Sequence, residues 1–202
     1  MSDARRYSPS AARNREPILE VLARVLPASG LVLEVASGSG EHAAFFGARL
    51  PHLIFQPTDP DPRNRASIAA WRDHATLDNL RPPLALDATE ERWPIAHADA
   101  VLCINMIHIA PWDACLGLVA GAAGVLPAAG ALVLYGPFRR GGRHTSPSNE
   151  AFDASLRAQD PAWGVRDLDD VVAAAARRGL ALDDAVDMPS NNLTVVLRRA
   201  AG

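Results

Sequence analysis

The chain has 202 residues, 49% of them hydrophobic, which suits one domain with a sizeable core and excludes a disordered protein. Its formal net charge of −3 argues against a nucleic-acid-binding protein that depends on bulk positive charge. All 20 basic residues are arginine, which excludes both a Schiff-base lysine and the lysine of a phosphate-binding P-loop.

Cysteine usage and hydropathy indicate where the protein resides. Cys103 and Cys115 form neither a CxxC pair nor a disulfide framework, and they suit buried positions in a reducing compartment. No apolar run reaches the ~18 residues of a membrane span, and residues 1–7 lack the apolar core of a signal peptide. We therefore expect a cytoplasmic protein with neither a membrane nor a nucleic-acid partner.

Hydrophobic periodicity predicts helices that alternate with strands. The expected helices span residues 16–26, 41–50, 62–74, 111–126, 149–158 and 167–178. The expected strands span residues 31–35, 52–58, 83–86, 99–105, 130–135, 180–187 and 193–198. This order predicts an α/β fold with a doubly wound, mostly parallel seven-stranded sheet. Because about five residues join the last two strands, too few for a parallel crossover, the last strand should run antiparallel.

The domain organisation follows from the same pattern. We expect one domain over residues 1–202, with two segments that cover the site as lids. One is the polar N-terminal arm, residues 1–15, and the other is an insertion, residues 137–166, rich in Gly, Pro, Ser and Arg.

The segment Leu31 to His42 combines a buried strand, a glycine-rich turn and the start of a helix. Gly38 and Gly40 let the backbone turn sharply and approach a ligand closely. Glu34 lies inside the apolar run, where an unpaired carboxylate is costly, so we expect a ligand group to bind it. The candidate cofactor-binding residues of this segment are Glu34, Ala36, Ser37, Gly38, Gly40 and His42.

Polar residues also follow the later strands, at the edge where ligands bind in open α/β sheets. Asp59 is placed to bind two ribose hydroxyls, and Asp87 to accept a hydrogen bond from an adenine amino group. Asn105 follows the next strand and is a further cofactor-binding candidate.

Two cofactors fit this arrangement. Residues 38–43 match the dinucleotide pattern G-x-G-x-x-A, with an acid about twenty residues further on. Glu34 favours S-adenosylmethionine instead, because that cofactor carries an ammonium and a carboxylate that need partners. Arg13 and Asn14, which precede the first predicted helix, are candidates for binding this carboxylate, although a solvated arm explains them equally well.

Motifs distributed over the whole chain carry a resemblance to one family. They are Ser8 to Leu19, Leu33 to His42, Phe55 to Asp59, Asn105 to Ile109, Pro111-Trp112, Leu134 to Phe138, Ser148-Asn149, Phe152-Asp153, Leu156-Arg157, Asp160-Pro161, Trp163-Gly164, Arg166-Asp167, Met188-Pro189 and Asn191-Asn192. The chain resembles the small class I methyltransferase-like proteins long catalogued as a domain of unknown function, which include a methyltransferase-like protein in animals. The resemblance implies a fold that binds S-adenosylmethionine and releases S-adenosylhomocysteine, but it implies no substrate. Ala36, where methyltransferases at large prefer glycine, recurs in this family.

The catalytic candidates lie near the expected position of the methyl group. His108 is the first candidate for a general base and Tyr135 the second, although a histidine bonded to a neighbouring carbonyl also explains His108. Residues 105–108 lack the signature of methyltransferases that act on DNA bases or protein glutamine, which argues against those substrates. Since no added domain, basic face or peptide groove is evident in the sequence, we expect a small-molecule acceptor. The candidate substrate residues are Tyr135, Phe138, Asn149, Arg157, Trp163, Asn191 and Asn192, and no metal site is expected.

The sequence therefore predicts an S-adenosylmethionine-dependent methyltransferase. Two alternatives remain open, a non-catalytic protein of the same fold that binds the cofactor and, less favoured, a nicotinamide-dependent oxidoreductase.

Overall fold

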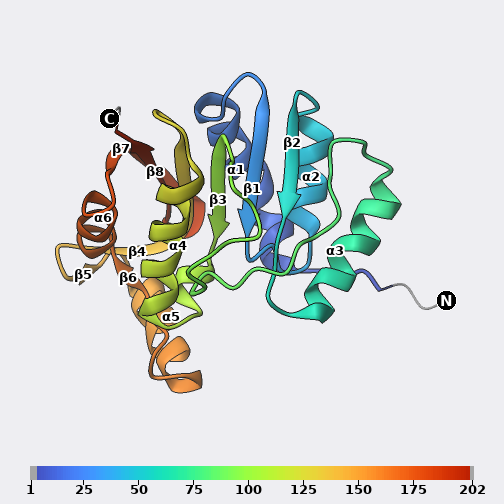
Figure 1. Cartoon of the computed structure of the whole chain (residues 1–202). Helices are drawn as coiled ribbons and strands as arrows, with labels where there is room; N and C mark the ends of the chain where they lie inside the picture. The colour runs from blue at the N-terminus through green and yellow to red at the C-terminus, as the bar shows by residue number, and fades with distance from the viewer. Residues whose placement is uncertain (1–3, 201–202) are drawn as a thin grey trace.

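The computed structural model describes residues 4–200, so the first three residues of the predicted arm and residues 201–202 lie outside the described part. A twisted central sheet separates two layers of helices, and its main strands stand side by side (Figure 1). Along the sheet the strands are β2 (Leu53–Pro57), β1 (Gly30–Val35), β3 (Ala100–Ile104), β4 (Ala131–Arg140), β8 (Asn192–Arg199) and β7 (Leu180–Met188).

The directions of these strands confirm the predicted fold class. β1 pairs in parallel with β2 and β3, and β3 pairs in parallel with β4. β8 runs antiparallel to both β4 and β7, as the short connection before it predicts. Two short strands, β5 (Arg143–His144) and β6 (Arg166–Asp167), pair with the outer end of β4. The carboxyl ends of β1 to β4 therefore meet at one edge of the sheet.

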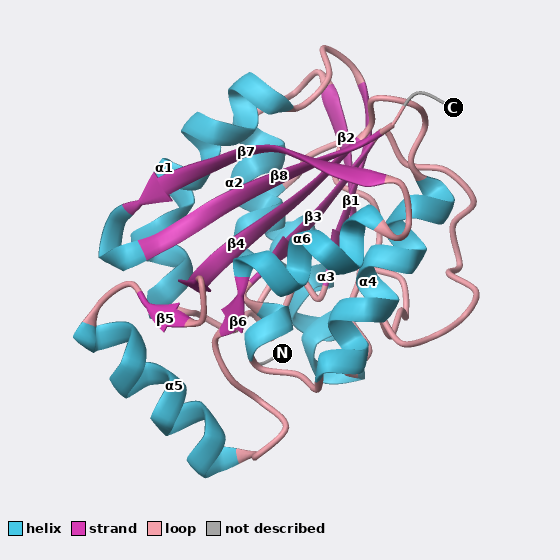
Figure 2. Ribbon diagram, turned by 90° about the vertical axis from the view of Figure 1, so that its left-hand side faces the viewer, coloured by secondary structure: helices cyan, strands magenta, loops and turns pink. Residues whose placement is uncertain are grey.

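The helices cover both faces of the sheet because strand side chains alternate between them. On β3, Ala100 and Leu102 pack into the core that α1 and α2 cover, whereas Val101 and Cys103 pack into the core beneath α4 and α6. The helices are α1 (Pro9–Val25), α2 (Glu41–Arg49), α3 (Pro62–Ala75), α4 (Trp112–Val125), α5 (Pro147–Gln159) and α6 (Leu168–Ala176), with short 3₁₀ turns η1 (Met106–His108) and η2 (Pro189–Asn191). Figure 2 shows α5 extending away from the sheet, beside β5.

The first helix begins earlier than predicted. Ser8 caps it, and Pro9 occupies its first turn, where a missing N–H costs nothing. Pro17 therefore lies inside α1 rather than at its start. As a result, Arg13 and Asn14 belong to the helix and do not precede it.

The strand predicted over residues 83–86 does not form. Within this segment Leu84 makes only an isolated bridge to Thr58, and Leu80, just before the segment, makes another to Phe55. Pro82 and Pro83 lie between these bridges and have no N–H to donate, so a continuous ladder is impossible. The strand predicted over residues 130–135 is, in contrast, longer than expected and continues to Arg140, so β4 includes the start of the predicted insertion.

Across residues 4–200, no helix combines the length and the apolar character needed to cross a membrane.

Two glycines of α4 provide a matched test of how residues 84–89 pack. A Cβ at Gly117 would lie 2.2 Å from the carbonyl oxygen of Ala88, whereas a Cβ at Gly124 would meet nothing within 4 Å. Gly117→Ala should lower the free energy of unfolding by about 1–3 kcal/mol, because backbone must move to admit the methyl group. Gly124→Ala should raise it by up to about 1 kcal/mol through helix propensity. Urea unfolding measures both, and equal effects of the two substitutions would contradict this packing.

Candidate active site

The glycine-rich turn is fixed by hydrogen bonds from Thr58, at the end of the neighbouring strand. The Thr58 amide and hydroxyl both donate to the Glu34 carbonyl, each at 2.9 Å. The Ser37 amide in turn donates to the Thr58 carbonyl at 2.8 Å. Ala36 has a φ of 57°, a left-handed conformation that is uncommon for a residue with a Cβ. Thr58, which sequence reasoning missed as a site residue, thus holds the turn against β2.

Glu34 is buried in the turn with an unused oxygen. Its side chain is only 2% exposed, and within the described residues its Oε2 has no hydrogen-bond partner. Burial raises the pKa of this carboxyl from 4.5 to about 7, while a hydrogen bond from Ser37 opposes the rise and the nearby Asp59 adds to it. A buried, unpartnered carboxylate oxygen is costly unless a cationic or hydrogen-bonding group of a ligand meets it.

Asp59 occupies the same edge and binds the turn directly. Its Oδ2 accepts a hydrogen bond from the Gly38 amide at 3.0 Å, and its Oδ1 accepts from the Asp61 amide at 2.9 Å and from Asn64 at 3.1 Å. Gly38 has open space where a Cβ would stand, so its backbone is accessible to a ligand. Because the Gly38 N–H already donates to a carboxylate, it is not free to bind a pyrophosphate.

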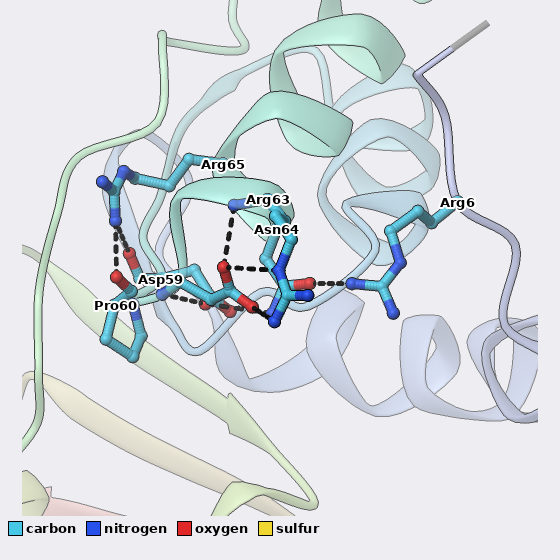
Figure 3. Close-up of polar contacts among 7 residues, drawn as sticks. Arg6, Asp59, Pro60, Arg63, Asn64 and Arg65 are labelled. Atoms are coloured by element: carbon cyan, nitrogen blue, oxygen red, sulfur yellow. Dashed lines mark hydrogen bonds and ion pairs between the residues drawn. The ribbon is translucent and has the colours of Figure 1, made fainter.

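The N-terminal arm reaches the same region from outside. The Arg6 amide donates to the Ser67 hydroxyl at 2.8 Å, and Ser67 donates to the Ser39 carbonyl of the glycine-rich turn at 2.6 Å. The Arg6 guanidinium also hydrogen-bonds Asn64, the residue that binds Asp59 (Figure 3). The two Arg6 contacts join parts of the chain about sixty residues apart, so no local sequence signal identified them.

Asp87 lies beyond β2, in the segment that replaces the predicted strand. Its Oδ1 accepts hydrogen bonds from the Thr89 amide at 2.9 Å and the Thr89 hydroxyl at 2.8 Å. The Asp59 amide donates to the Leu84 carbonyl at 3.1 Å, which holds this segment beside the end of β2. Glu34 and Asp59 thus lie at the same edge of the sheet, and Asp87 follows three residues after Leu84, which is held beside that edge.

A cavity of about 500 Å³ opens beside this edge, between α1, α5, the end of β4 and the turn before β8. We call it the acceptor cavity. Its lining residues are Ser10, Arg13, Asn14, Pro17, Asn105, Ile109, Tyr135, Pro137, Ser148, Asn149, Phe152, Pro189, Ser190 and Asn192. The structure thus brings together six predicted site residues from five separate segments of the chain, namely Arg13, Asn14, Asn105, Tyr135, Asn149 and Asn192. Phe152 of α5, which was not predicted, also lines the cavity.

Tyr135 lies at the wall of the acceptor cavity, in a network of amides. Asn192 donates to its phenol oxygen at 3.0 Å, and Asn14 lines the same cavity. Asn14 Oδ1 is 2.8 Å from Nε2 of His42, which therefore carries the ring proton. Burial lowers the pKa of His42 to about 4, with the charge of Arg15 contributing, and raises the pKa of Tyr135 above its ordinary value. Both side chains are therefore neutral near pH 7.

Asn149 connects α5 to the last turn. Its Nδ2 donates to the Thr145 hydroxyl at 3.0 Å and to the Asn191 carbonyl at 2.8 Å. The Asn191 side chain donates to Ser148 at 3.3 Å and does not line the acceptor cavity. These bonds hold α5 and the turn together as one wall of the cavity.

His108 does not occupy the position expected of a general base. It is 1% exposed, packs edge-on against Phe138, and lies outside the cavity lining. Its Nδ1 accepts a hydrogen bond from the Arg166 amide at 3.2 Å, and its carbonyl accepts from the Gly164 amide at 2.9 Å. Burial, with the nearby Arg166 charge, lowers the pKa of the imidazole to about 3. Its contacts make His108 an anchor for residues 164–166.

Three further substrate candidates also lie away from the acceptor cavity. Phe138 is fully buried in the core beneath α4 and α6, because β4 continues past residue 135 and turns this side chain inward. Arg157 forms an ion pair with Asp153 at 3.1 Å, and Asp153 accepts a hydrogen bond from the Val165 amide at 2.6 Å. Trp163 donates its amide to the Asp160 carbonyl at 2.9 Å and lies outside the cavity lining.

Comparison with known proteins places the chain in a family. A family model described as a protein of unknown function, DUF938, matches residues 5–199. The chain belongs to this family. The match and the solved structures below confirm the predicted resemblance to a methyltransferase-like family of unknown function.

Several solved methyltransferases have the same fold. The chain is similar to an O-methyltransferase family protein from Burkholderia thailandensis, with a TM-score of 0.82, 19% identity, and coverage of 96% of this chain and 58% of that one. It is similar to an O-methyltransferase family 2 protein from Planctomyces limnophilus, solved with apigenin, with a TM-score of 0.77, 21% identity, and coverage of 95% and 60%. Human N-acetylserotonin methyltransferase, solved with S-adenosylmethionine, matches with a TM-score of 0.77, 13% identity, and coverage of 95% and 53%. The chain thus spans less than two thirds of each of these proteins, and the likeness shows a shared fold.

The raised pKa of Glu34 predicts a pH-dependent stability. Since the folded chain binds this proton more tightly than the unfolded chain, stability falls as the pH rises from 4.5 through about 7. Glu34→Gln cannot ionise, so at pH 8 it should raise the free energy of unfolding by roughly 3 kcal/mol, and at pH 4 it should change it little. Urea unfolding at both pH values measures this, with exposed Glu20→Gln as the control. An unaltered pH dependence in Glu34→Gln would contradict the burial of this charge.

Proposed function

We propose that this protein is an S-adenosylmethionine-dependent methyltransferase acting on a small-molecule acceptor. The observation that carries the proposal is the buried Glu34 oxygen without a partner among the described residues, at the carboxyl edge of the parallel strands. An ammonium group is the ligand chemistry that satisfies such an oxygen. The shared fold of the solved methyltransferases supports the same conclusion.

The residues along the edge fit the parts of this cofactor. Glu34 would bind the ammonium, Asp59 the ribose hydroxyls and Asp87 the adenine amino group, while the open space at Gly38 admits close approach. Gly40 packs against Ile68 and so would support the turn from behind. Arg13 and Asn14, on the cavity side of α1, would hold the carboxylate, and Asn105 would border both ligands. When bound, S-adenosylmethionine supplies a methyl group on a positively charged sulfur that is a good leaving group.

The protein's own contribution would be positioning and exclusion of water. The arm, through Arg6 and Ser8, contacts α2 and α3 beside the glycine-rich turn. The insertion, through α5, forms a wall of the acceptor cavity and is anchored by Asn149 and by His108. We therefore propose that both segments cover the site, and that the chain forms one domain around it.

Two alternative functions differ in how well the geometry supports them. A nicotinamide oxidoreductase is disfavoured, because Asp59 occupies the Gly38 N–H that a pyrophosphate would need. A non-catalytic protein that binds the cofactor is favoured by one observation, namely that no described residue lining the acceptor cavity carries an imidazole or a carboxylate to act as a base. Methyl transfer to an acceptor that needs no base remains compatible with this lining.

Binding of S-adenosylhomocysteine tests the cofactor assignment. Glu34→Ala and Asp59→Ala should each weaken its affinity at least tenfold in calorimetry, because each removes a carboxylate partner of the ligand. Glu20→Ala, an exposed site on α1, should leave the affinity unchanged.

The same titration with NADH should show no binding. Unchanged affinity in both carboxylate variants, or binding of NADH in place of S-adenosylhomocysteine, would refute the assignment.

A further inference from the structure

The charges that line the acceptor cavity are unusual for a site that removes a proton. Arg13 supplies a positive charge, and among the described lining residues no side chain carries a negative charge. The other polar groups are neutral amides, three serine hydroxyls and the Tyr135 phenol. The nearest histidine in the network, His42, is neutral and donates its Nε2 proton to Asn14.

The Tyr135 hydroxyl is oriented as a donor. Its oxygen accepts a hydrogen bond from the Asn192 amide at 3.0 Å, and the hydrogen bonds among the described residues give its own hydrogen no acceptor. A phenol oxygen that accepts from an amide keeps its own hydrogen for another group. Since Tyr135 borders the acceptor cavity, this hydrogen is available to an oxygen-rich ligand there.

The charges of the cofactor and of the cavity walls indicate the charge of the methyl acceptor, an inference that rests on the proposed function. Glu34 would balance the cofactor's ammonium and Arg13 its carboxylate, so the positive sulfur would face walls without a negative charge. A negatively charged acceptor supplies the missing charge, and it needs no base because its proton has already left. The apolar side chains of Ile109, Pro137 and Phe152 leave room for a hydrophobic body beside the charged group.

We propose that the methyl acceptor is a small organic carboxylate. A carboxylate oxygen forms the new bond to the methyl carbon while the carbon–sulfur bond breaks and its electron pair stays on sulfur. The products are a neutral methyl ester and S-adenosylhomocysteine, and no proton is released. Tyr135, which was first considered as a base, donates a hydrogen bond to the acceptor instead.

The test compares three probes of similar shape and different charge, namely benzoate, benzamide and benzylamine. Each is titrated by calorimetry into the protein saturated with sinefungin, an analogue of S-adenosylmethionine that carries an ammonium group in place of the methyl sulfonium and has no methyl group to transfer. Benzoate should bind at least tenfold more tightly than either of the others. Tyr135→Phe should weaken benzoate binding about fivefold or more, and Tyr7→Phe, at an exposed position, should not change it. Equal or tighter binding of benzamide or benzylamine would overturn the proposal.

A second measurement identifies the bond that forms. The protein is incubated with methyl-labelled S-adenosylmethionine and the small-molecule fraction of a cell extract, and the product is treated with mild alkali. Methyl esters release their label as volatile methanol, whereas methyl ethers and methylamines do not. Alkali-stable label would refute a carboxylate acceptor and leave the methyltransferase function intact. Failure of S-adenosylhomocysteine to bind at all would instead refute the proposed function.

Discussion

Thr58 fixes the geometry on which the candidate site depends. Its amide and hydroxyl donate to the Glu34 carbonyl, and its own carbonyl accepts from the Ser37 amide, so the backbone turns at a fixed point between β1 and α2. This turn leaves the Glu34 carboxyl buried with a free oxygen and brings the Gly38 amide against Asp59. A polar group buried in this way is retained at a cost to stability, which is the expected sign of a binding site.

The two faces of the sheet have different roles at the candidate site. Tyr135 points to the α1 face, where the Asn192 amide of β8 donates to its phenol and the acceptor cavity opens. His108 and Phe138 lie on the opposite face, in the core beneath α4 and α6. The first face therefore carries the proposed binding chemistry, whereas the second anchors the insertion whose helix α5 forms the cavity wall.

The sequence predicted those features of the site that depend on residue patterns within single segments of the chain. Glu34, Gly38 and Asp59 come together as expected, because an apolar strand, small residues and the next strand end set their positions. Contacts between distant segments were beyond such reasoning. The burial of His108 depends on Arg166, 58 residues away. The start of α1 was predicted too late because Pro17, which lies inside the helix, has the same sequence signal as a proline in a first turn. The prediction of a strand near Leu84 was wrong because Pro82 and Pro83 have no N–H to donate to a strand ladder.

The number of protons released on cofactor binding shows whether the Glu34 carboxylate meets the ammonium of the cofactor. If Glu34 holds a proton at pH 6 because burial raises its pKa to about 7, an ammonium bound beside it must displace that proton. Calorimetry of S-adenosylhomocysteine binding at pH 6, in two buffers of different ionisation enthalpy, counts the protons released. The native protein should release close to one proton, and any residual binding to Glu34→Gln should release none. Binding without proton release by the native protein would contradict this role of Glu34.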